Sequence, residues 1–326
     1  MEKLYPFKFK PQPKPTIWGG NALQTLFNKN FPTDKQIGES WELSSVQRSL
    51  SVVSNGFLKG NNIEELAEIY MGELLGEKIY EHYGVEFPVL IKLIDARQTL
   101  SVQVHPDDEV ALERHNAYGK TEMWYVLQAE PEAVLYIGFN RDTTAQEFYE
   151  RVQDETLLEI LNAVKVKSGD AFFIPPGTIH AIGKGIVLAE VQQTSDITYR
   201  VYDWGREHDA ELARDMHIEH AIDVIDYTKK TEIQLAFEKA QNSVQKIKHC
   251  PYFTTNFLDL TKPLQRNLLS HDSFVVYICL EGNLTIQYNS GTETITKGET
   301  ILIPAAIADI TLIPAPTATL LEVFVE

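Results

Sequence analysis

Alternating apolar and polar positions predict strands along much of the chain. Residues 99–106 read TLSVQVHP, with small or polar residues between the apolar ones, and residues 88–96 read PVLIKLIDA, an apolar run interrupted by Lys92. Two further runs, MWYVLQA (123–129) and AVLYIGF (133–139), flank Glu130-Pro131. Short runs of this kind, separated by turn residues, are typical of β-strands. From Phe87 onward the sequence therefore predicts a mainly β structure.

Helical spacing occurs in only a few places. Ile63, Leu66, Ala67 and Tyr70 follow an i, i+3, i+4, i+7 pattern after a predicted capping box of Asn62 and Glu65. A short polar helix is predicted over residues 107–116. A helical insertion is predicted over residues 140–165, opened by a capping box of Thr144 and Glu147 and continued by the apolar stripe of TLLEILNAV (156–164). Residues 208–248 are mixed in character and are interpreted as a connector.

One internal repeat indicates two copies of a β unit. Residues 167–182 align without gaps on residues 296–311, with Gly169 opposite Gly298 and Pro175 opposite Pro304. Upstream, residues 122–128 align on 274–280. Many short strands with turn residues between them favour barrels or jelly rolls. In this alignment Phe274 replaces Glu122 and Asp309 replaces His180, so we expect the chemistry to belong to the first copy.

Composition and charge exclude several classes of function. The 326 residues suffice for two domains, predicted at 1–240 and 241–326. A net charge of −17 without a basic stripe argues against a nucleic-acid partner but not against a small anionic substrate. No apolar run of membrane-spanning length and no signal peptide are found in the sequence. The missing targeting signal and the low number of cysteines, two, predict a cytoplasmic protein. A monomer or a homodimer is expected.

Four polar residues are candidates for a metal site. Gln103 and His105 are two apart on a predicted strand and so project from the same face. Glu122 opens the next strand, and His180 follows a Pro-Pro-Gly turn. Two imidazoles and a carboxylate suit zinc, and equally Fe(II), Mn or Ni, while Gln103 could fill a fourth position. Each residue alone could instead be an ordinary polar side chain; their order and the altered second copy favour a metal site.

Two signatures resemble those of the cupin superfamily. The segment GDAFFIPPGTIH (169–180) has the form G-x5-P-x-G-x2-H of the second cupin signature, and Gln103-x-His105 is similar to the first with one histidine replaced. Glu122 comes later than that signature expects, and Lys184 stands where asparagine is usual. The resemblance implies two cupin, or jelly-roll β-barrel, domains with short helical insertions, the second domain being degenerate.

Ordered blocks of the chain resemble type I mannose-6-phosphate isomerases of the short bacterial form. The blocks run from Trp18 to Arg206 and comprise Trp18-Gly19-Gly20, 92–108, 119–127, 174–182 and 190–206. The resemblance implies reversible conversion of mannose 6-phosphate to fructose 6-phosphate through an enediol, with one zinc ion per chain polarising the C1 and C2 oxygens. A redox-inert cation suits this reaction because it stabilises the negative charge that develops on those oxygens.

The same resemblance implies roles for seven further residues. Arg200 is the expected catalytic arginine, and Lys120, Glu190 and Asp196 are alternative proton-transfer groups. Gly119 stands where the family often has histidine, which excludes a histidine base at that position. The phosphate is expected at Lys92, Ser101 and Arg206. The bland alternatives are a structural salt bridge of Arg200 with Asp196 or Glu190 and a solvated loop position for Lys120.

Other functions remain open on the sequence. A cupin can also be an iron-dependent dioxygenase or a cupin-type glucose-6-phosphate isomerase. An iron oxygenase normally shows more histidine ligands and has no need of Lys92, Ser101 and Arg200. A non-enzymatic sugar-binding or storage bicupin is the third alternative, and the intact ligand set of the first copy argues against it.

Overall fold

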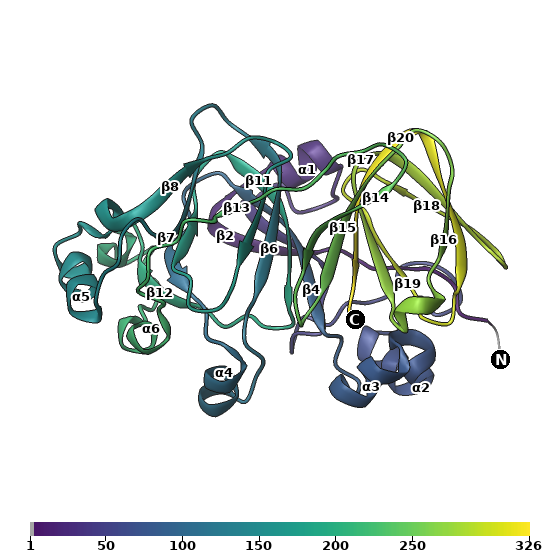
Figure 1. Ribbon diagram of the computed structural model, residues 1–326, viewed down its shortest axis with the longest axis horizontal. Coiled ribbons are helices and arrows are strands. Elements are labelled where there is room, and N and C mark those ends of the chain that lie inside the picture. Colours follow the sequence, from purple (N-terminus) through teal and green to yellow (C-terminus); the bar gives the residue numbers. More distant parts are fainter. Residues whose placement is uncertain (1–2) are drawn as a thin grey trace.

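The computed structural model describes residues 3–326 and shows a mainly β protein with two β-rich halves lying side by side (Figure 1). The N-terminal half contains two sheets and the C-terminal half one. The seven-stranded sheet comprises β2 (Gln12–Gly20), β3 (Ile37–Leu43), β4 (Val89–Ala96), β6 (Glu122–Ala129), β9 (Ala171–Ile174), β11 (Ile186–Gln193) and β13 (Gln234–Leu235). The five-stranded sheet comprises β5 (Val102–Val104), β7 (Val134–Phe139), β8 (Leu161–Lys165), β10 (His180–Ile182) and β12 (Tyr199–Tyr202).

The C-terminal half is built on an eight-stranded antiparallel sheet, which β1 from the N-terminus joins. Its strands are β1 (Phe7–Lys8), β14 (Val244–His249), β15 (Thr254–Leu260), β16 (Leu264–Asn267), β17 (Val275–Tyr288), β18 (Gly291–Thr296), β19 (Thr300–Ile303) and β20 (Asp309–Phe324). The helices of the molecule are α1 (Ala22–Phe27), α2 (Ile63–Leu75), α3 (Glu77–Tyr83), α4 (Asp108–His115), α5 (Ala145–Gln153) and α6 (Ile218–Val224), with 3-10 turns η1 (Leu157–Ile160), η2 (Arg206–His208) and η3 (Leu269–His271). No helix within residues 3–326 combines the length and the apolar character needed to cross a membrane.

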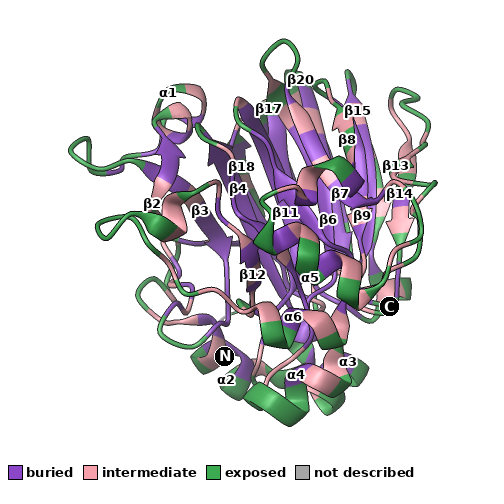
Figure 2. Cartoon of the chain, turned by 90° about the vertical axis from the view of Figure 1, so that its left-hand side faces the viewer, coloured by how far each residue is buried: buried purple, intermediate pink, exposed green. Residues whose placement is uncertain are grey.

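The two sheets of the N-terminal half face each other across an apolar core. This core receives Trp124 and Leu188 from the larger sheet and Leu135 from the smaller one. Because alternate residues of a strand point to opposite faces, the residues between these apolar ones point away from this core. Polar side chains enter the space between the sheets at its open end. Figure 2 shows buried residues running along the strands, while the helices expose their outer sides.

Strand β4 explains the long apolar run of residues 88–96. All eight of its residues are buried because both of its faces are covered. Ile94 and Ala96 pack in the core between the sheets, and Ile91 and Leu93 pack in a second core shared with the C-terminal half. A strand covered on both faces reads as continuous hydrophobic sequence, so its two charged residues, Lys92 and Asp95, require an explanation. Asp95 accepts a hydrogen bond from the Ala22 amide at 2.7 Å, which leaves Lys92.

The predicted helices over residues 63–70 and 107–116 are confirmed. At the start of α2, the Asn62 side chain accepts from the Glu65 amide at 3.0 Å, and the Glu65 carboxylate accepts from the Asn62 amide at 3.0 Å. This is the predicted capping box. At the start of α4, Asp107 accepts from the Val110 amide at 3.0 Å.

The helical prediction for residues 156–164 is wrong. Helix α5 ends at Gln153, and the stripe forms the turn η1 followed by strand β8, which pairs with β7. Leu157, Ile160 and Leu161 are buried all the same, in the core under α5 and α6. A short apolar run can be buried as a helix or as a strand. Here it forms a strand because it can pair with the free edge of β7. Of the box predicted at Thr144, only the bond from the Glu147 amide (3.2 Å) is present.

Strand pairing supports the repeat but shifts one part of its alignment by one residue. Ile174 of β9 pairs with Glu122, whereas Ile303 of β19 pairs with Val275. The structural counterpart of Glu122 is therefore Val275, and the replacement by Phe274 inferred from the ungapped alignment is wrong. The replacement of His180 by Asp309 stays a prediction.

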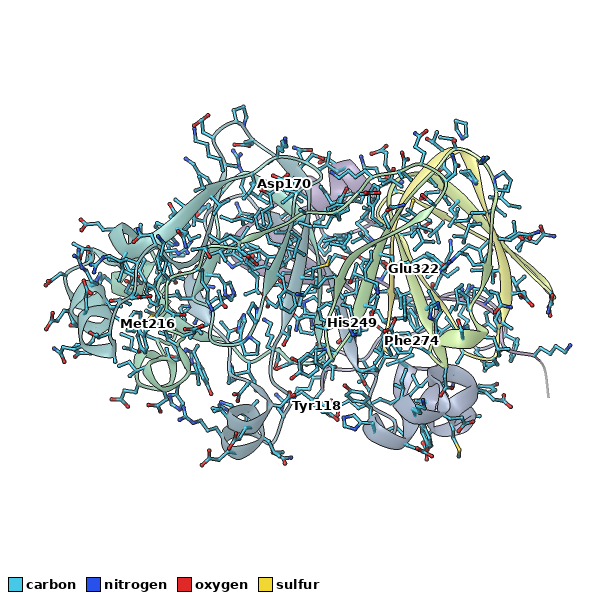
Figure 3. All side chains as sticks on the ribbon, in the orientation of Figure 1. Tyr118, Asp170, Met216, His249, Phe274 and Glu322 are labelled. Atoms are coloured by element: carbon cyan, nitrogen blue, oxygen red, sulfur yellow. The ribbon has the colours of Figure 1, made fainter. Side chains whose placement is uncertain are left out.

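The two halves share one core. Phe87 packs against Phe274, which Figure 3 labels, with ring centroids 4.3 Å apart, and β1 pairs with β19 of the C-terminal sheet. The division at residues 240 and 241 stays a prediction. The structure adds that residues 7 and 8 belong to the eight-stranded sheet of the C-terminal half.

Candidate active site

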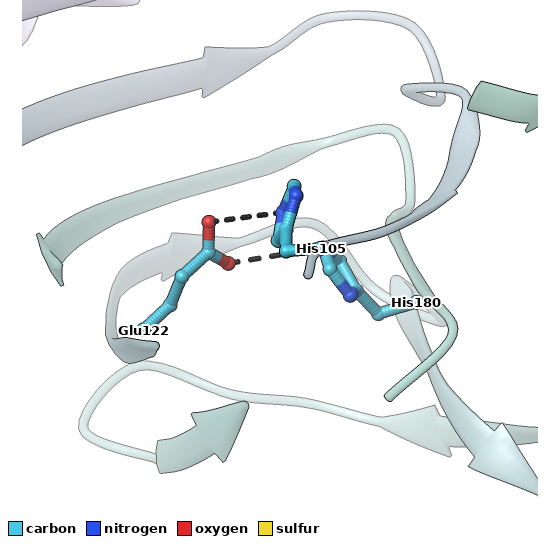
Figure 4. A group of neighbouring side chains, drawn as sticks. All are labelled: His105, Glu122 and His180. Carbon is cyan, nitrogen blue, oxygen red and sulfur yellow. Dashed lines mark ion pairs between the residues drawn. The ribbon is translucent and has the colours of Figure 1, made fainter. Parts of the chain in front are cut away.

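His105, Glu122 and His180 meet at one end of the core between the two sheets. His105 directly follows β5, Glu122 opens β6 and His180 opens β10, and all three are buried. His105 Nε2 lies 3.2 Å from Glu122 Oε1, and His180 Nε2 lies 3.7 Å from Glu122 Oε2. Figure 4 shows the carboxylate facing both imidazoles. One ligand atom from each residue lies within 4.8 Å of the others.

The cluster fits a bound metal ion. Both ring nitrogens of His105 and both carboxylate oxygens of Glu122 are buried and make no well-aligned hydrogen bond, although Lys120 and His105 lie within ion-pair range of Glu122 Oε1. Such atoms destabilise a folded protein unless something binds them. Tetrahedral zinc with bonds of about 2.05 Å places its ligand atoms about 3.3 Å apart, close to the two distances found here.

Neighbouring groups orient His180 and place Gln103 beside it. His180 Nδ1 lies 2.8 Å from the Thr178 carbonyl oxygen, which makes Nδ1 the protonated nitrogen and leaves Nε2 free to bind. Gln103 Nε2 lies 3.3 Å from this Nε2. Because the two ends of an amide exchange places on a half-turn, the same position can present the Gln103 oxygen to an ion. Its part as a fourth ligand stays a prediction.

Burial and local charge put the three residues in the protonation states that metals require. Burial, followed by the charge of Lys120, lowers the pKa of His105 to about 3. Burial also lowers the pKa of His180. Burial alone would raise the pKa of Glu122, but Lys120, with Nζ 3.0 Å from Glu122 Oε1, and His105 together hold it well below its ordinary value. Neutral imidazoles and a carboxylate result.

A cavity of about 180 Å³ adjoins the cluster and brings together most of the residues predicted from the sequence. Lys120 and Gln103, which contact Glu122 and His180, form its inner end. The predicted residues that line it are Lys92, Ser101, Gln103, Lys120, Glu190, Asp196 and Arg200. Trp18, Trp41 and Glu39 contribute further walls.

Lys92 and Glu190 form a buried pair on neighbouring strands of this cavity. Lys92 Nζ lies 2.9 Å from Glu190 Oε1, and Trp124 Nε1 donates to Glu190 Oε2 at 2.9 Å. Burial lowers the pKa of Lys92, but the charges of Glu190, Glu39 and Glu122 together raise it by more, so the net shift is upward. Burial and the charge of Glu122 raise the pKa of Glu190. The free-energy cost of burying the charge of Lys92 is thus offset largely by its pairing with Glu190.

Arg200 and Arg206 lie in different surroundings. Arg200 lines the cavity and donates through Nε to the Ser101 hydroxyl at 3.2 Å. It forms no ion pair with Asp196 or Glu190 within residues 3–326, so the alternative of a structural salt bridge to them is wrong. Arg206 does not line the cavity; it donates to Asp203 at 2.7 Å and to the Thr99 carbonyl at 2.9 Å.

Sequence reasoning missed Arg214, which lines the cavity in addition to the predicted residues. Arg214 sits in the irregular segment before α6, outside every motif, so no sequence pattern marked it. Gly119 has a clear structural reason: a Cβ there would lie 2.5 Å from the Asp107 carbonyl carbon. The start of α4 thus leaves no space for the histidine often found in relatives at this position.

Comparison with known proteins agrees with this geometry. A family model of the type I phosphomannose isomerase catalytic domain matches residues 6–139, and a model of the mannose-6-phosphate isomerase cupin domain matches residues 243–315, which confirms the cupin prediction for the C-terminal half. Mannose-6-phosphate isomerase ManA of Bacillus subtilis is 34% identical over 94% of this chain and 95% of its own. The Streptococcus mutans mannose-6-phosphate isomerase is 34% identical over 93% of each chain.

Solved structures lead to the same family. The crystal structure of the mannose 6-phosphate isomerase from Bacillus subtilis superposes with a TM-score of 0.87 at 30% identity, covering 98% of this chain and 99% of that one. Similarity of this extent covers the metal cluster, the cavity and the C-terminal half together. The chain belongs to the type I mannose-6-phosphate isomerase family of enzymes.

Proposed function

We propose that this protein interconverts mannose 6-phosphate and fructose 6-phosphate with one zinc ion held by His105, Glu122, His180 and Gln103. The observation that carries the proposal is the set of buried ligand atoms of His105 and Glu122 that make no well-aligned hydrogen bond, beside a cavity lined by Lys92 and Arg200. Bound zinc would supply positive charge next to the C1 and C2 oxygens, where the isomerisation develops negative charge.

The reaction moves one proton between carbons and one between oxygens. A base removes the proton from C2 of the aldose and returns it to C1, through an enediol, while the hydroxyl proton passes from O2 to O1. Among the three candidates, Glu190 already binds Lys92 and Trp124 through its two oxygens. Asp196 is exposed and lines the cavity without such partners, and Lys120 Nζ lies beside Glu122. We therefore favour Asp196 as the base and Lys120 as the group that moves the oxygen-bound proton.

The other cavity residues bind and orient the sugar in this proposal. Ser101 shares a strand face with Gln103, and Arg200 donates to the Ser101 hydroxyl, so the two can together face an anionic group. Lys92 contributes positive charge to the same wall. Consistent with such a metabolite, we propose a cytoplasmic enzyme that acts without a nucleic-acid partner.

One assay tests this proposal against the other cupin functions. Purified protein is incubated with chelator, dialysed, and assayed with and without added zinc for fructose 6-phosphate made from mannose 6-phosphate. We expect activity to vanish with chelator, to return with zinc and to fall by at least about 1,000-fold in His105→Ala. Glucose 6-phosphate as the product from fructose 6-phosphate, or full activity in His105→Ala, would contradict the proposal. Metal analysis of the untreated protein identifies the ion.

A further inference from the structure

Two arginines, Arg206 and Arg214, bind one buried carboxylate near the outer end of the catalytic cavity, and a third, Arg200, lines the cavity. Ser101, which accepts a bond from Arg200, precedes Gln103 by two residues on one strand face, and so lies about 7 Å farther from the metal cluster. Asp203 is fully buried and accepts hydrogen bonds from both Arg206 and Arg214. This end of the cavity therefore carries an excess of fixed positive charge.

The hydrogen bonds of Asp203 fix the direction of Arg214. Arg214 Nε donates to Asp203 Oδ2 at 3.0 Å and Nη2 donates to Asp203 Oδ1 at 2.6 Å, a two-point contact that holds the guanidinium plane. Within residues 3–326, Arg214 donates to no other group, so its Nη1 edge is available. The same side chain lines the catalytic cavity and an open hollow on its outer side, bounded by Thr16 and Gln36.

The lysines of the cavity are paired with carboxylates, and Arg206 differs from Arg214 in lying outside the cavity lining. Lys92 is paired with Glu190 at 2.9 Å and lies 3.9 Å from Glu39. Arg206 donates to Asp203 and to the Thr99 carbonyl and stays outside the cavity lining. After burial, the charge of Arg214 is the strongest influence that lowers the pKa of Arg200, ahead of Arg206. Arg200 and Arg214 line the same cavity, and two cations on one wall favour an anion between them.

We infer that Arg214 is a substrate-binding residue that, with Arg200 and Ser101, holds the phosphate of the sugar, and that Asp203 is its positioning residue. The inference rests on the proposed function and moves the phosphate contact predicted for Arg206 to Arg214. A dianion at this end would receive a planar guanidinium donor whose direction is set before binding.

Binding of inorganic phosphate to the metal-free protein tests the inference without catalysis. Titration calorimetry compares the wild type with Arg214→Gln, Arg206→Gln and, as a matched control, Arg97→Gln, whose side chain is exposed and pairs with Glu130 away from the cavity. We expect Arg214→Gln to weaken phosphate binding about 10- to 100-fold, as for a lost charge-assisted bond, and Arg97→Gln to leave it unchanged. Retained affinity in Arg214→Gln with loss in Arg206→Gln would overturn the inference.

Steady-state kinetics of the zinc-loaded enzyme gives a second, independent measurement. We expect Arg214→Gln to raise KM for mannose 6-phosphate by about 10- to 100-fold with a much smaller change in kcat, and Arg214→Lys to recover part of the loss. Asp203→Asn should shift KM in the same direction. A 10- to 100-fold loss of kcat with unchanged KM in Arg214→Gln would overturn the assignment. Arg214-dependent phosphate binding in a wild type that makes no fructose 6-phosphate would contradict the proposed reaction alone and support the phosphate site.

Discussion

Glu122 is the central residue of the proposed metal site, because its two oxygens face two different histidines. Changing Glu122 to Gln removes the negative charge and one acceptor while keeping the shape. Even outer-shell changes reduce metal affinity about 10- to 100-fold, so we expect Glu122→Gln to weaken zinc binding by about 100-fold or more. Competition with a chromogenic chelator measures this. Glu130→Gln, a change at an exposed carboxylate, serves as the control and should bind zinc like the wild type.

Without metal, His105 makes the protein sensitive to acid. Its pKa is lowered from 6.5 to about 3 in the folded state, so below pH 6.5 the unfolded chain binds a proton that the folded one does not. Stability is therefore lost as the pH falls from about 6.5 toward about 3, by up to about 1.4 kcal/mol per pH unit for this group. Urea unfolding of the metal-free protein at several pH values gives the free energy of unfolding as a function of pH. This free energy should fall less steeply with decreasing pH in His105→Gln than in the wild type. The same pH dependence in both proteins would contradict this account.

At the scale of single residues, sequence reasoning located the cluster and most of the cavity because these residues lie in ordered motifs on strands. It placed the phosphate contact at Arg206 by resemblance, whereas the structure places Arg214 at the cavity and engages Arg206 elsewhere. The difference arises from Asp203, whose two oxygens organise both arginines. A contact between side chains on an irregular segment leaves no periodic trace in a sequence.

Among the elements, helices with a cap and a full apolar stripe were predictable and short apolar runs were not. α2 combines both signals, whereas residues 156–164 offer an apolar stripe that turn and strand bury equally well. The choice between them depends on β7, whose pairing with β8 no local pattern contains. Strand β5 is only three residues long, yet its alternation was readable because buried Val102 and Val104 flank Gln103, which lines the cavity.

The cap of α2 should contribute measurably to stability. Asn62 accepts from the Glu65 amide and receives the reciprocal bond from the Glu65 carboxylate. We expect Asn62→Ala to lower the free energy of unfolding by about 1 kcal/mol, because one helix-end amide loses its acceptor. Asn62→Ser supplies a comparable acceptor and should restore most of the difference. Urea unfolding of the three proteins checks this, and equal stability of Asn62→Ala and wild type would contradict it.

For the molecule as a whole, the C-terminal half keeps a polar network where the N-terminal half has its site. Tyr277 and Glu322 are paired across β17 and β20, as Trp124 and Glu190 are across β6 and β11. Glu322 accepts from Tyr277 at 2.6 Å and from Arg266 at 2.8 Å. Figure 3 places Glu322 among the strands of this half. In the C-terminal half, the side chains of this network bond to one another. They occupy the place that the candidate site takes in the N-terminal half.

Removing one partner of this network should destabilise the protein strongly. We expect Glu322→Ala to lower the free energy of unfolding by about 3–5 kcal/mol, because Arg266 is left partly buried without its carboxylate. Chemical unfolding followed by fluorescence measures the loss. The double variant Arg266→Met/Glu322→Leu removes both charges and should recover much of it. A double variant that is less stable than Glu322→Ala would contradict this explanation.

The pairing of Phe7 and Lys8 with Leu302 and Ile301 bears on how the chain is assembled during synthesis. β1 is made long before β19, which begins at Thr300. Loop closure over so many residues is slow compared with local pairing. The first contacts of this segment are therefore with residues 52–54, through Lys10 N to the Val52 carbonyl at 2.9 Å and Ser54 N to the Lys8 carbonyl at 2.8 Å. The C-terminal sheet gains its edge strand only after β19 has been made.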